Sequence, residues 1–469
     1  MSLENVVALE RNERGIAAVT GILKQRFGER AQTGQAMREQ HGHTTTYVPT
    51  QAPDIVIFAE SAEEVQEVVR LCAQHKVPVI AFGAGSSLEG QVNAPAGGVS
   101  LDLTRMNRVV AVHAEDLDCV VEPGIMRREL NEYLRDTGLF FPIDPGANAT
   151  LGGMASTRAS GTNAVRYGTM RENVLALKAV MPDGNLIETS KRVKKTAAGY
   201  DLTRLLIGAE GTLGIITELT LKLQGIPQAI SGGICPFPDV ERACRAVIET
   251  IQMGVPVARI ELVNKLQMEA LILHSKLPYE AQPYLFVEFH GTESGVAEQA
   301  EIFGAIAAEN GGGPFRWTAN AEERDRLWRA RHDAYHASFL LRPGAKGVST
   351  DVCVPISRLA DCIAETEQDI AETGIVAPIV GHVGDGNFHL LLLLDTEDAA
   401  EMARAEAFMD RLVRRAIAME GTCTGEHGIG QGKMKYLALE LGDTTRYMRA
   451  IKKALDPDNI MNPGKMLIL

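Results

Sequence analysis

The stretch Val77-Pro-Val-Ile-Ala-Phe-Gly-Ala-Gly-Ser-Ser87 decides the fold of the first half of this chain. Its first six residues are apolar apart from the proline break and predict a buried strand that delivers a glycine-serine loop. A helix is predicted before it, because Ser61-Ala-Glu-Glu64 is a capping box. Apolar residues follow that box at helical spacing and end near His75: Val65, Val68, Val69 and Cys72.

The loop of Gly83, Ala84, Gly85, Ser86 and Ser87 offers backbone amides and two hydroxyls that can form an anion-binding nest. A Rossmann fingerprint is disfavoured, because position 88 is Leu and Glu89-Gly90 does not open a helix. A Walker motif fails too, because no glycine-rich loop ends in Gly-Lys followed by Ser or Thr. Taken alone, the loop is more typical of an ordinary glycine-serine turn.

Further glycine-rich segments follow this loop in the chain, and one extended ligand could contact all of them. They are Pro142–Ala147, Thr150–Ser156, Ser160–Gly161, Arg166–Thr169 and Glu210–Thr217. In this order they resemble the FAD-binding domain of vanillyl-alcohol-oxidase-type flavoproteins, also called PCMH-type. The resemblance implies that residues 83–87 hold the pyrophosphate and that the Thr150 to Gly161 stretch runs along the flavin.

The C-terminal stretch Asn459–Lys465 resembles the segment that folds back onto the flavin in this family. The cofactor-binding residues implied by the resemblance are Gly83, Ala84, Gly85, Ser86, Ser87, Pro145, Thr150, Gly152, Gly153, Ser156, Ser160, Gly161, Tyr167, Gly168, Gly211, Gly214, Ile216 and Asn462. Some relatives link FAD covalently through His or Cys, but neither occurs between Gly83 and Leu101. Non-covalent FAD is therefore expected.

Length and charge bound the class of protein. At 469 residues the chain exceeds one ordinary core of about 150 residues. The sequence pattern changes near Gly225-Ile226-Pro227. Before it, short apolar runs alternate with glycine turns; beyond it, longer helical patterns (residues 361–372 and 399–420) alternate with strands, as in an α+β domain. The expected parts are an N-terminal helical segment (1–46), an FAD-binding domain (47–226) and an α+β substrate or cap domain (227–469). The net charge of −13 argues against a nucleic-acid partner.

The sharpest local motif is Gly381-His-Val-Gly-Asp-Gly-Asn-Phe-His389. Asp385-Gly386 predicts a two-residue hairpin turn, which would make His382 and His389 a directly opposed cross-strand pair able to share a metal ion. Glu426, in Gly425-Glu-His-Gly428, suggests a third ligand and leaves positions open for a substrate. The alternative is that the two histidines only stabilise a hairpin.

Together, GHxGDGNxH and GEHG resemble the C-terminal domain of FAD-linked D-2-hydroxy-acid dehydrogenases. The resemblance implies that His382, His389 and Glu426 bind zinc or manganese, that His427 is the general base, and that Arg331 holds the substrate carboxylate. The bidentate guanidinium fork suits that task, although Arg331 could also be a surface helix residue. His332 and His336 have the spacing of a metalloprotease helix, but Asp333 stands where that motif requires Glu.

The expected reaction is oxidation of a D-2-hydroxy acid to the 2-oxo acid. Relatives specific for hydroxyglutarate carry Lys and Asn where this chain has Ser349 and Leu391, which favours a small or apolar substituent such as that of D-lactate. D-2-hydroxyglutarate, and glycolate within a multi-subunit oxidase, are the alternatives. A flavin-free metal-dependent hydrolase and a non-catalytic electron-transfer subunit are alternatives from other classes.

The expected electron acceptor and cellular location follow from motifs that the sequence lacks. Without a nicotinamide fingerprint, the expected electron acceptor is a cytochrome, a quinone or an electron-transfer flavoprotein. No apolar run is long enough to span a bilayer, and the first eleven residues lack a secretory pattern. A cytoplasmic location is expected, and a peripheral place at the inner membrane is compatible with it. A homodimer is the default oligomeric state.

Overall fold

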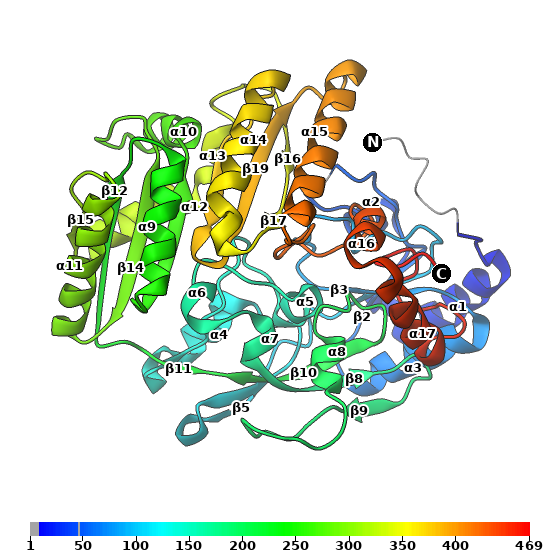
Figure 1. The fold of residues 1–469 in the computed structure, drawn as a ribbon. Coiled ribbons are helices and arrows are strands. Elements are labelled where there is room, and N and C mark those ends of the chain that lie inside the picture. Colours follow the sequence, from blue (N-terminus) through cyan, green and yellow to red (C-terminus); the bar gives the residue numbers. More distant parts are fainter. Residues whose placement is uncertain (1–8, 46) are drawn as a thin grey trace. The chain divides into compact units, whose positions relative to one another are not determined.

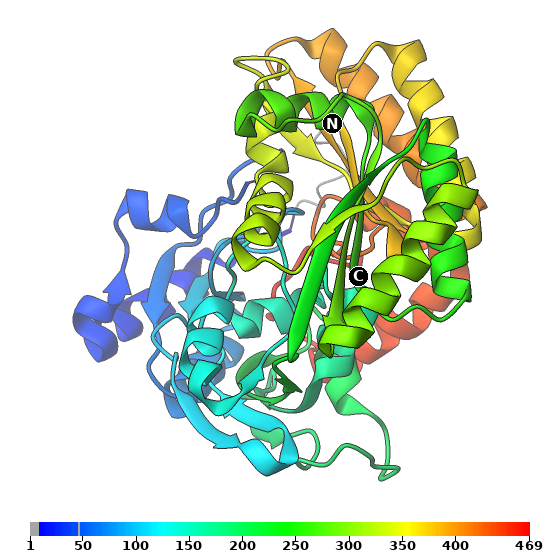
Figure 2. The ribbon, with the colours of Figure 1, turned by 90° about the vertical axis from the view of Figure 1, so that its left-hand side faces the viewer.

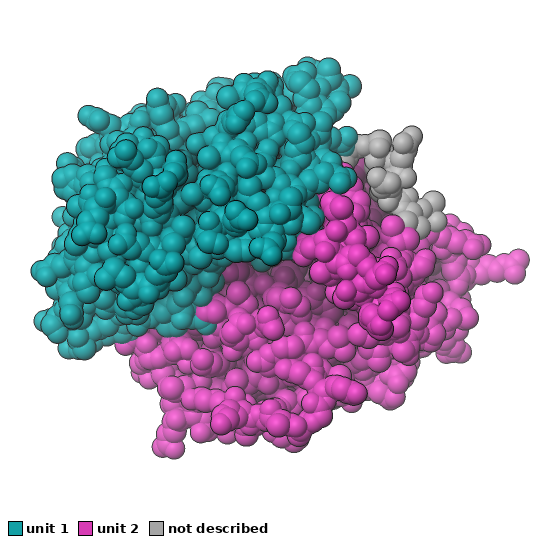
Figure 3. Space-filling view, viewed as in Figure 1, with its two compact units in different colours: residues 1, 161–167, 227–425 teal, residues 2–160, 168–226, 426–469 magenta. Residues whose placement is uncertain are grey.

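The computed structural model describes residues 9–45 and 47–469; residues 1–8 and 46 of the predicted N-terminal segment lie outside the described residues. The chain divides into two compact units, coloured separately in Figure 3. Unit 1 contains Gly161–Tyr167 and Pro227–Gly425. Unit 2 contains the chain up to Ser160, then Gly168–Ile226 and Glu426–Leu469.

Unit 2 is built on two main sheets, whose strands Figure 1 labels. The first has the order β1-β2-β4-β3, and β2 and β3 both pair parallel with β4. Its strands are β1 (Ala31–Gln32), β2 (Ile55–Phe58), β4 (Val99–Asp102) and β3 (Val79–Phe82). The second is antiparallel: β5 (Val109–His113), β6 (Asp118–Val121), β10 (Ile215–Lys222), β8 (Val174–Val180) and β9 (Leu186–Glu188). A small ribbon pairs β7 (Leu139–Phe140) with β11 (Gln224–Gly225).

Several helices of unit 2 begin at a residue whose side chain caps the helix. In α3 (Ala62–His75), the Ser61 side chain accepts a hydrogen bond from the Glu64 amide, and the buried residues are those of the predicted apolar stripe. The helix delivers the chain into β3, as predicted. The others are α1 (Glu13–Phe27), α2 (Gln35–Gln40), α4 (Arg127–Leu134), α5 (Leu151–Thr157), α7 (Met170–Asn173), α8 (Leu202–Leu206), α16 (Met434–Leu441) and α17 (Thr445–Leu455).

The C-terminal stretch folds back within unit 2, as expected. Met461 forms a parallel bridge with Val79, the first residue of β3. The Val79 amide donates to the Ile460 carbonyl at 2.8 Å, and the Asn462 amide donates to the Val79 carbonyl at 2.9 Å. Because Ile460 and Met461 are buried in the same core cluster as β2, β3 and α3, the end of the chain is part of this core.

Unit 1 is built on one eight-stranded sheet of order β15-β12-β14-β13-β18-β19-β16, with β17 also paired to β19. Its strands are β15 (Arg316–Thr318), β12 (Ala229–Pro236), β14 (Tyr284–Gly291), β13 (Val257–Val263), β18 (Ile379–His382), β19 (Asn387–Leu394), β16 (Lys346–Ser349) and β17 (Val352–Cys353). Every pairing of these strands is antiparallel.

Helices cover both faces of this sheet (Figure 2). One layer consists of α9 (Val240–Gln252), α11 (Glu293–Glu309), α14 (Leu359–Thr373) and α15 (Ala399–Ala418). On the other face lie α10 (Lys265–Ser275), α12 (Ala321–His332) and α13 (Ala334–Ser338), whose apolar residues share a core cluster with Val263 and Phe286. The short α6 (Ala164–Tyr167) completes the unit and contacts β13.

The units coincide with the expected α+β architecture but not with every expected boundary. The two compact units divide between Ile226 and Pro227. Residues 426–469 pack in unit 2, although the sequence assigned them to the substrate domain, because their buried partners lie in β3 and its neighbours. The described part of the N-terminal segment also joins the unit 2 core through Val19 and Leu23 of α1. Among the described residues, no helix is both long and apolar enough to cross a membrane.

Candidate active site

One buried carboxylate organises the polar face of the unit 1 sheet. Arg259 and Glu261 interrupt the otherwise apolar strand β13, and their side chains share a face because strand residues alternate. Glu261 is fully buried. The register pairs Leu262 with Gly381, so the next step along the ladder sets Glu261 opposite His382.

The hairpin that carries the two histidines differs in register from the predicted one. His382 pairs with Asn387, and His389 pairs with Val380, because four residues, Val383 to Gly386, make the connection. The wider turn is set by packing: Val383 is fully buried, and Gly386 (φ +79°) approaches the Val354 carbonyl so closely that a Cβ would lie 2.0 Å from it.

The two histidines nevertheless share one face of the sheet. The observed register is displaced by two residues from the predicted one, and a displacement by two leaves side chains on the same face. His382 and His389 are therefore diagonal neighbours, with ring centroids 5.2 Å apart and ring planes at 77°. They remain close enough for one ion to lie between them.

Both imidazoles are oriented through Nδ1. His382 Nδ1 lies 2.7 Å from Glu261 Oε1, and His389 Nδ1 lies 3.1 Å from the Thr350 carbonyl oxygen. Because carboxylate and carbonyl oxygens accept, the proton of each neutral imidazole belongs on Nδ1 and the lone pair on Nε2. This is the outer-shell arrangement of metal-binding histidines.

Glu261 also binds Arg331, which reaches the same carboxylate from α12. Arg331 Nη2 donates to Glu261 Oε2 at 2.6 Å. Burial raises the pKa of Glu261, but His382 and Arg331 outweigh it and hold that pKa below its usual range. Arg331 is only 7% exposed, which makes the surface-helix interpretation wrong. Its buried Nε has no hydrogen-bond partner among the described residues, so a donor remains for a substrate carboxylate.

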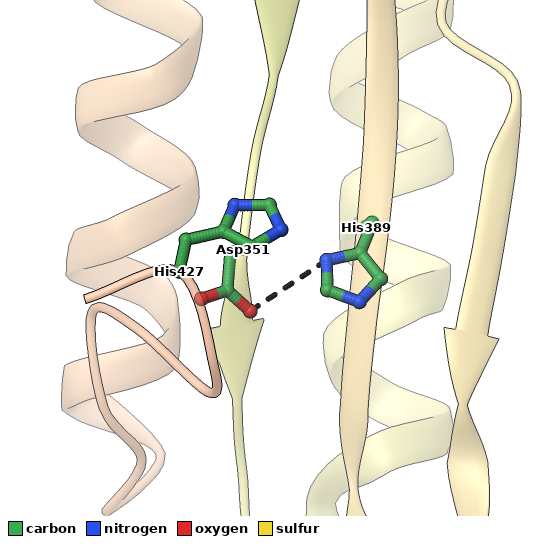
Figure 4. Close-up of side chains that lie close together, drawn as sticks. All are labelled: Asp351, His389 and His427. Carbon is green, nitrogen blue, oxygen red and sulfur yellow. Dashed lines mark ion pairs between the residues drawn. The ribbon is translucent and has the colours of Figure 1, made fainter. Parts of the chain in front are cut away.

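A second carboxylate, Asp351, faces His389 from the neighbouring chain segment. Figure 4 shows this pair, with Asp351 Oδ1 3.6 Å from His389 Nδ1. Asp351 Oδ1 accepts from Asn387 Nδ2 at 2.8 Å, and Oδ2 accepts from Thr424 Oγ1 at 2.7 Å. Since both oxygens already hold protein groups, Asp351 is suited to orienting its neighbours.

The segment that leads into the GEHG loop is held by a backbone hydrogen bond and by close packing. The Thr422 amide donates to the Cys353 carbonyl at 2.8 Å, and a Cβ on Gly425 would lie 2.2 Å from Asn387 Nδ2. Glu426 is bonded to Gly425. One ligand atom from each of His382, His389 and Glu426 lies within 4.8 Å of the others, and Asp351, His389 and His427 form a second such group.

The donor set of the first group fits a divalent ion. Two imidazoles and one carboxylate, with open positions, are a known catalytic combination for zinc and related metals. The groups of potential ligands found among the described residues do not include His332 or His336. Asp333 separates the two helices that carry them, so the metalloprotease spacing does not lie on one continuous helix.

The predicted pyrophosphate loop follows β3 in unit 2, and its backbone has little room for side chains. A Cβ on Gly83 would lie 2.2 Å from Thr150 Oγ1, and one on Gly85 (φ +63°) would lie 2.7 Å from the Phe82 ring. Ser87 Oγ is buried without a hydrogen-bond partner among the described residues. These features fit a cradle whose polar groups are completed by a bound phosphate.

Most of the other predicted cofactor residues lie in the same unit as this loop. Thr150 precedes α5, which carries Gly152, Gly153 and Ser156. Asn462 Nδ2 donates to the Glu210 carbonyl at 2.7 Å, directly before Gly211. Unit 2 also holds Ala84, Ser86, Pro145, Ser160, Gly168, Gly214 and Ile216.

Two predicted cofactor residues, Gly161 and Tyr167, belong to unit 1. There Tyr167 Oη lies 2.7 Å from His290 Nδ1. Sequence reasoning missed Glu261, Thr350 and Asp351, which surround the two histidines. The charged Arg259 and Glu261 inside an apolar strand were the available signal, because buried charges need a partner or a function.

Two family descriptions match this chain. "FAD binding domain" matches residues 53–190, and "FAD linked oxidases, C-terminal domain" matches residues 226–466. Together they include the glycine-rich segments up to Thr169 and the GHxGDGNxH and GEHG motifs, while Glu210–Thr217 lies between the two matched ranges.

Several known proteins are similar over most of the chain. A probable mitochondrial D-lactate dehydrogenase of Danio rerio is 50% identical over 466 residues, covering 98% of this chain and 93% of that protein. A mitochondrial D-lactate dehydrogenase [cytochrome] of Arabidopsis thaliana is 46% identical over 416 residues, covering 88% and 73%. The solved structure of p-cresol methylhydroxylase with substrate bound has a TM-score of 0.82 at 18% identity, covering 97% of each chain, and shows the fold alone.

Proposed function

The chain belongs to the FAD-linked oxidases and is an FAD-dependent oxidoreductase, and from this premise we propose that it oxidises D-lactate to the 2-oxo acid with a divalent metal ion. The observation that carries the proposal is the hydrogen-bonded set formed by Glu261, His382 and His389 on one sheet face and by Arg331, which reaches Glu261 from α12. In this set, the guanidinium of Arg331, which can bind a substrate carboxylate, is linked through Glu261 to the oriented imidazole of His382 and lies in the same site as that of His389. The family match disfavours a hydrolase without flavin.

In the proposed reaction, the cofactors and the side chains of the protein have separate roles. FAD, when bound, supplies the acceptor for the electron pair and hydrogen from C2 of the acid. An ion at His382, His389 and Glu426 would supply positive charge near the substrate oxygens. Arg331 binds the substrate carboxylate through its remaining donors, and Glu261 keeps that guanidinium and His382 in place. His427 takes the proton of the 2-hydroxyl as general base.

The positions that favour a small substrate are neighbours in space. Ser349 of β16 pairs directly with Leu391 of β19, two residues beyond His389. A Cβ on the adjacent Gly347 would lie 2.9 Å from both Leu391 Cδ1 and Phe339 Cζ, so the surroundings of Leu391 are apolar. A second carboxylate placed among these apolar side chains would lose its hydration, which supports lactate over hydroxyglutarate.

The acceptor and location are part of the same proposal. The name of the Arabidopsis relative contains cytochrome, which supports a cytochrome as acceptor for this chain over a quinone or an electron-transfer flavoprotein. Both curated relatives are mitochondrial by name. The cytoplasmic location and the homodimer remain predictions.

Anaerobic titration of the flavin spectrum tests the proposal. Purified protein is mixed with D-lactate, L-lactate, glycolate or D-2-hydroxyglutarate, before and after treatment with a chelator. Bleaching by D-lactate that disappears after chelation, and returns with added zinc or manganese, is expected. Equal bleaching after complete metal removal would contradict the metal role, and faster bleaching by glycolate or hydroxyglutarate would contradict the substrate.

A further inference from the structure

Glu210 of unit 2 is a buried carboxylate bound to the backbone that follows His427. Its side chain accepts hydrogen bonds from the Ile429 amide at 2.7 Å and the Gly430 amide at 2.8 Å. The residue is 5% exposed and has a left-handed backbone (φ +52°). A buried carboxyl group in a strained backbone conformation needs a compensating role, and holding these two amides is the one its contacts show.

The loop around His427 is shaped to receive this carboxylate. Gly428 (φ +82°) and Gly430 (φ +47°) both have positive φ. A Cβ on Gly428 would lie 2.5 Å from Glu210 Oε1, and one on Gly430 would lie 2.2 Å from the Glu89 carbonyl oxygen. Only glycine permits this approach, so the loop and the carboxylate fit as a pair.

Gln91 holds the same loop from the other side. Its Nε2 donates to the His427 carbonyl at 2.8 Å, and its Oε1 accepts from the Glu89 amide at 3.0 Å. The backbone is therefore fixed at His427 itself and again two and three residues later. A loop held at these three residues cannot shift the backbone of His427 without breaking these hydrogen bonds.

The same two residues connect the loop to the flavin-binding segments. Asn462 Nδ2 donates to the carbonyls of Gln91, at 3.0 Å, and Glu210, at 2.7 Å. Glu210 directly precedes Gly211, and Gln91 lies four residues beyond Ser87 in the chain. Segments predicted to bind FAD and the loop carrying His427 thus share one hydrogen-bonded framework within unit 2.

We propose that Glu210, assisted by Gln91, is a positioning residue that fixes His427 relative to the flavin-binding segments. The inference rests on the proposed function in taking His427 as the general base. Proton transfer demands hydrogen-bond distance between base and hydroxyl, and a misplacement near 1 Å can cost about 100-fold in rate. Because Glu210 acts through the backbone, its loss changes catalysis more than substrate binding.

Glu210→Gln is the sharpest test. The substitution keeps size and shape, but an amide offers one acceptor and sets an NH2 group against the second backbone N–H. For D-lactate, kcat should fall about 10- to 100-fold, while KM and the Kd for FAD change less than about threefold. Glu122→Gln is the matched control. Glu122 is a 6% exposed carboxylate of unit 2 that accepts from the Arg108 amide at 2.9 Å, and its loss should leave kcat unchanged.

Hydrogen exchange gives a readout independent of turnover. The Ile429 and Gly430 amides should lose protection in Glu210→Gln and keep it in Glu122→Gln. Should Glu210→Gln not fold, Gln91→Met must lower kcat in the same way. Unchanged kcat with unchanged exchange would overturn the inference and leave the proposed function standing. A wild-type flavin reduced by no 2-hydroxy acid would overturn the function, while exchange would still decide whether Glu210 holds the loop.

Discussion

At the scale of single residues, Glu261 links His382 of β18 to Arg331 of α12. Its Oε1 is hydrogen-bonded to His382 Nδ1, and its Oε2 accepts a hydrogen bond from Arg331 Nη2. An anionic partner on Nδ1 raises the basicity of the opposite nitrogen and fixes the ring plane, which strengthens a metal–imidazole bond. The same charge holds the guanidinium of Arg331 in place.

Glu261→Gln should therefore weaken metal binding by about 10- to 100-fold, because the neutral amide cannot provide the same partner for His382. Competition with a chromophoric chelator measures the Kd. Glu288→Gln is the matched control, because Glu288 lies on β14 opposite Arg259 and binds Nε2 of His290, which is not a proposed ligand, at 2.9 Å. An equal Kd in wild type and Glu261→Gln would mean that Glu261 does not support the ion.

At the scale of elements, α14 and α15 are joined by a small ionic network. Asp369 accepts from Arg411 Nη2 at 2.6 Å and from Arg415 Nη2 at 3.0 Å. Burial raises the pKa of Asp369, but the two arginines outweigh it and lower that pKa below its usual range. A depressed pKa in the folded state stabilises the fold above the unfolded pKa and loses this effect as pH falls through the folded pKa.

Asp369→Asn should lower Tm at pH 7, and the difference from wild type should shrink as pH falls below about 4, where the unfolded carboxyl titrates. Thermal unfolding at pH 7, 5, 4 and 3 measures this. Glu365→Gln is the control: Glu365, whose side chain is 55% exposed, pairs with Arg415 Nε at 3.2 Å, and exposed pairs contribute little. A Tm difference that stays constant across this range would contradict the assignment.

At the scale of the whole molecule, the C-terminal segment packs against strand β3 of the same unit. Unit 2 is assembled from three separate segments, and the last of them supplies Met461 beside β3 and Asn462 beside Glu210. Lys452, buried in α17, donates to the carbonyls of Thr212 at 2.8 Å and Met461 at 2.9 Å. The flavin-binding unit is therefore incomplete until the chain end is in place.

Removing residues 459–469 should release FAD and lower Tm on the order of 10 °C, because several buried side chains leave the core. The flavin-to-protein absorbance ratio and thermal unfolding measure both effects. Removing only Ile468 and Leu469, which are 51% and 44% exposed, should change neither. Full flavin retention in the longer deletion would show that the C-terminal stretch is dispensable for the cradle.

The sequence alone determined what is local. Helix α3, strand β3, helices α14 and α15 and the break after Ile226 all follow from short-range patterns of caps, periodicity and glycine. The motifs around His382, His389 and Glu426 carried enough chemistry to predict which side chains would meet, and their atoms lie within 4.8 Å. The order of the glycine-rich segments resembled that of an FAD-binding domain, and the family match to residues 53–190 confirms this prediction.

Only the tertiary structure decided what depends on distant partners. The hairpin register was set by the burial of Val383 and by Val354 against Gly386, which local turn rules cannot see. Glu261 entered the site because β13 and β18 pair across more than a hundred residues of chain. The C-terminal stretch joined unit 2 because its apolar side chains found their core there. Strand pairing and burial are choices among distant surfaces, and no short stretch of sequence encodes them.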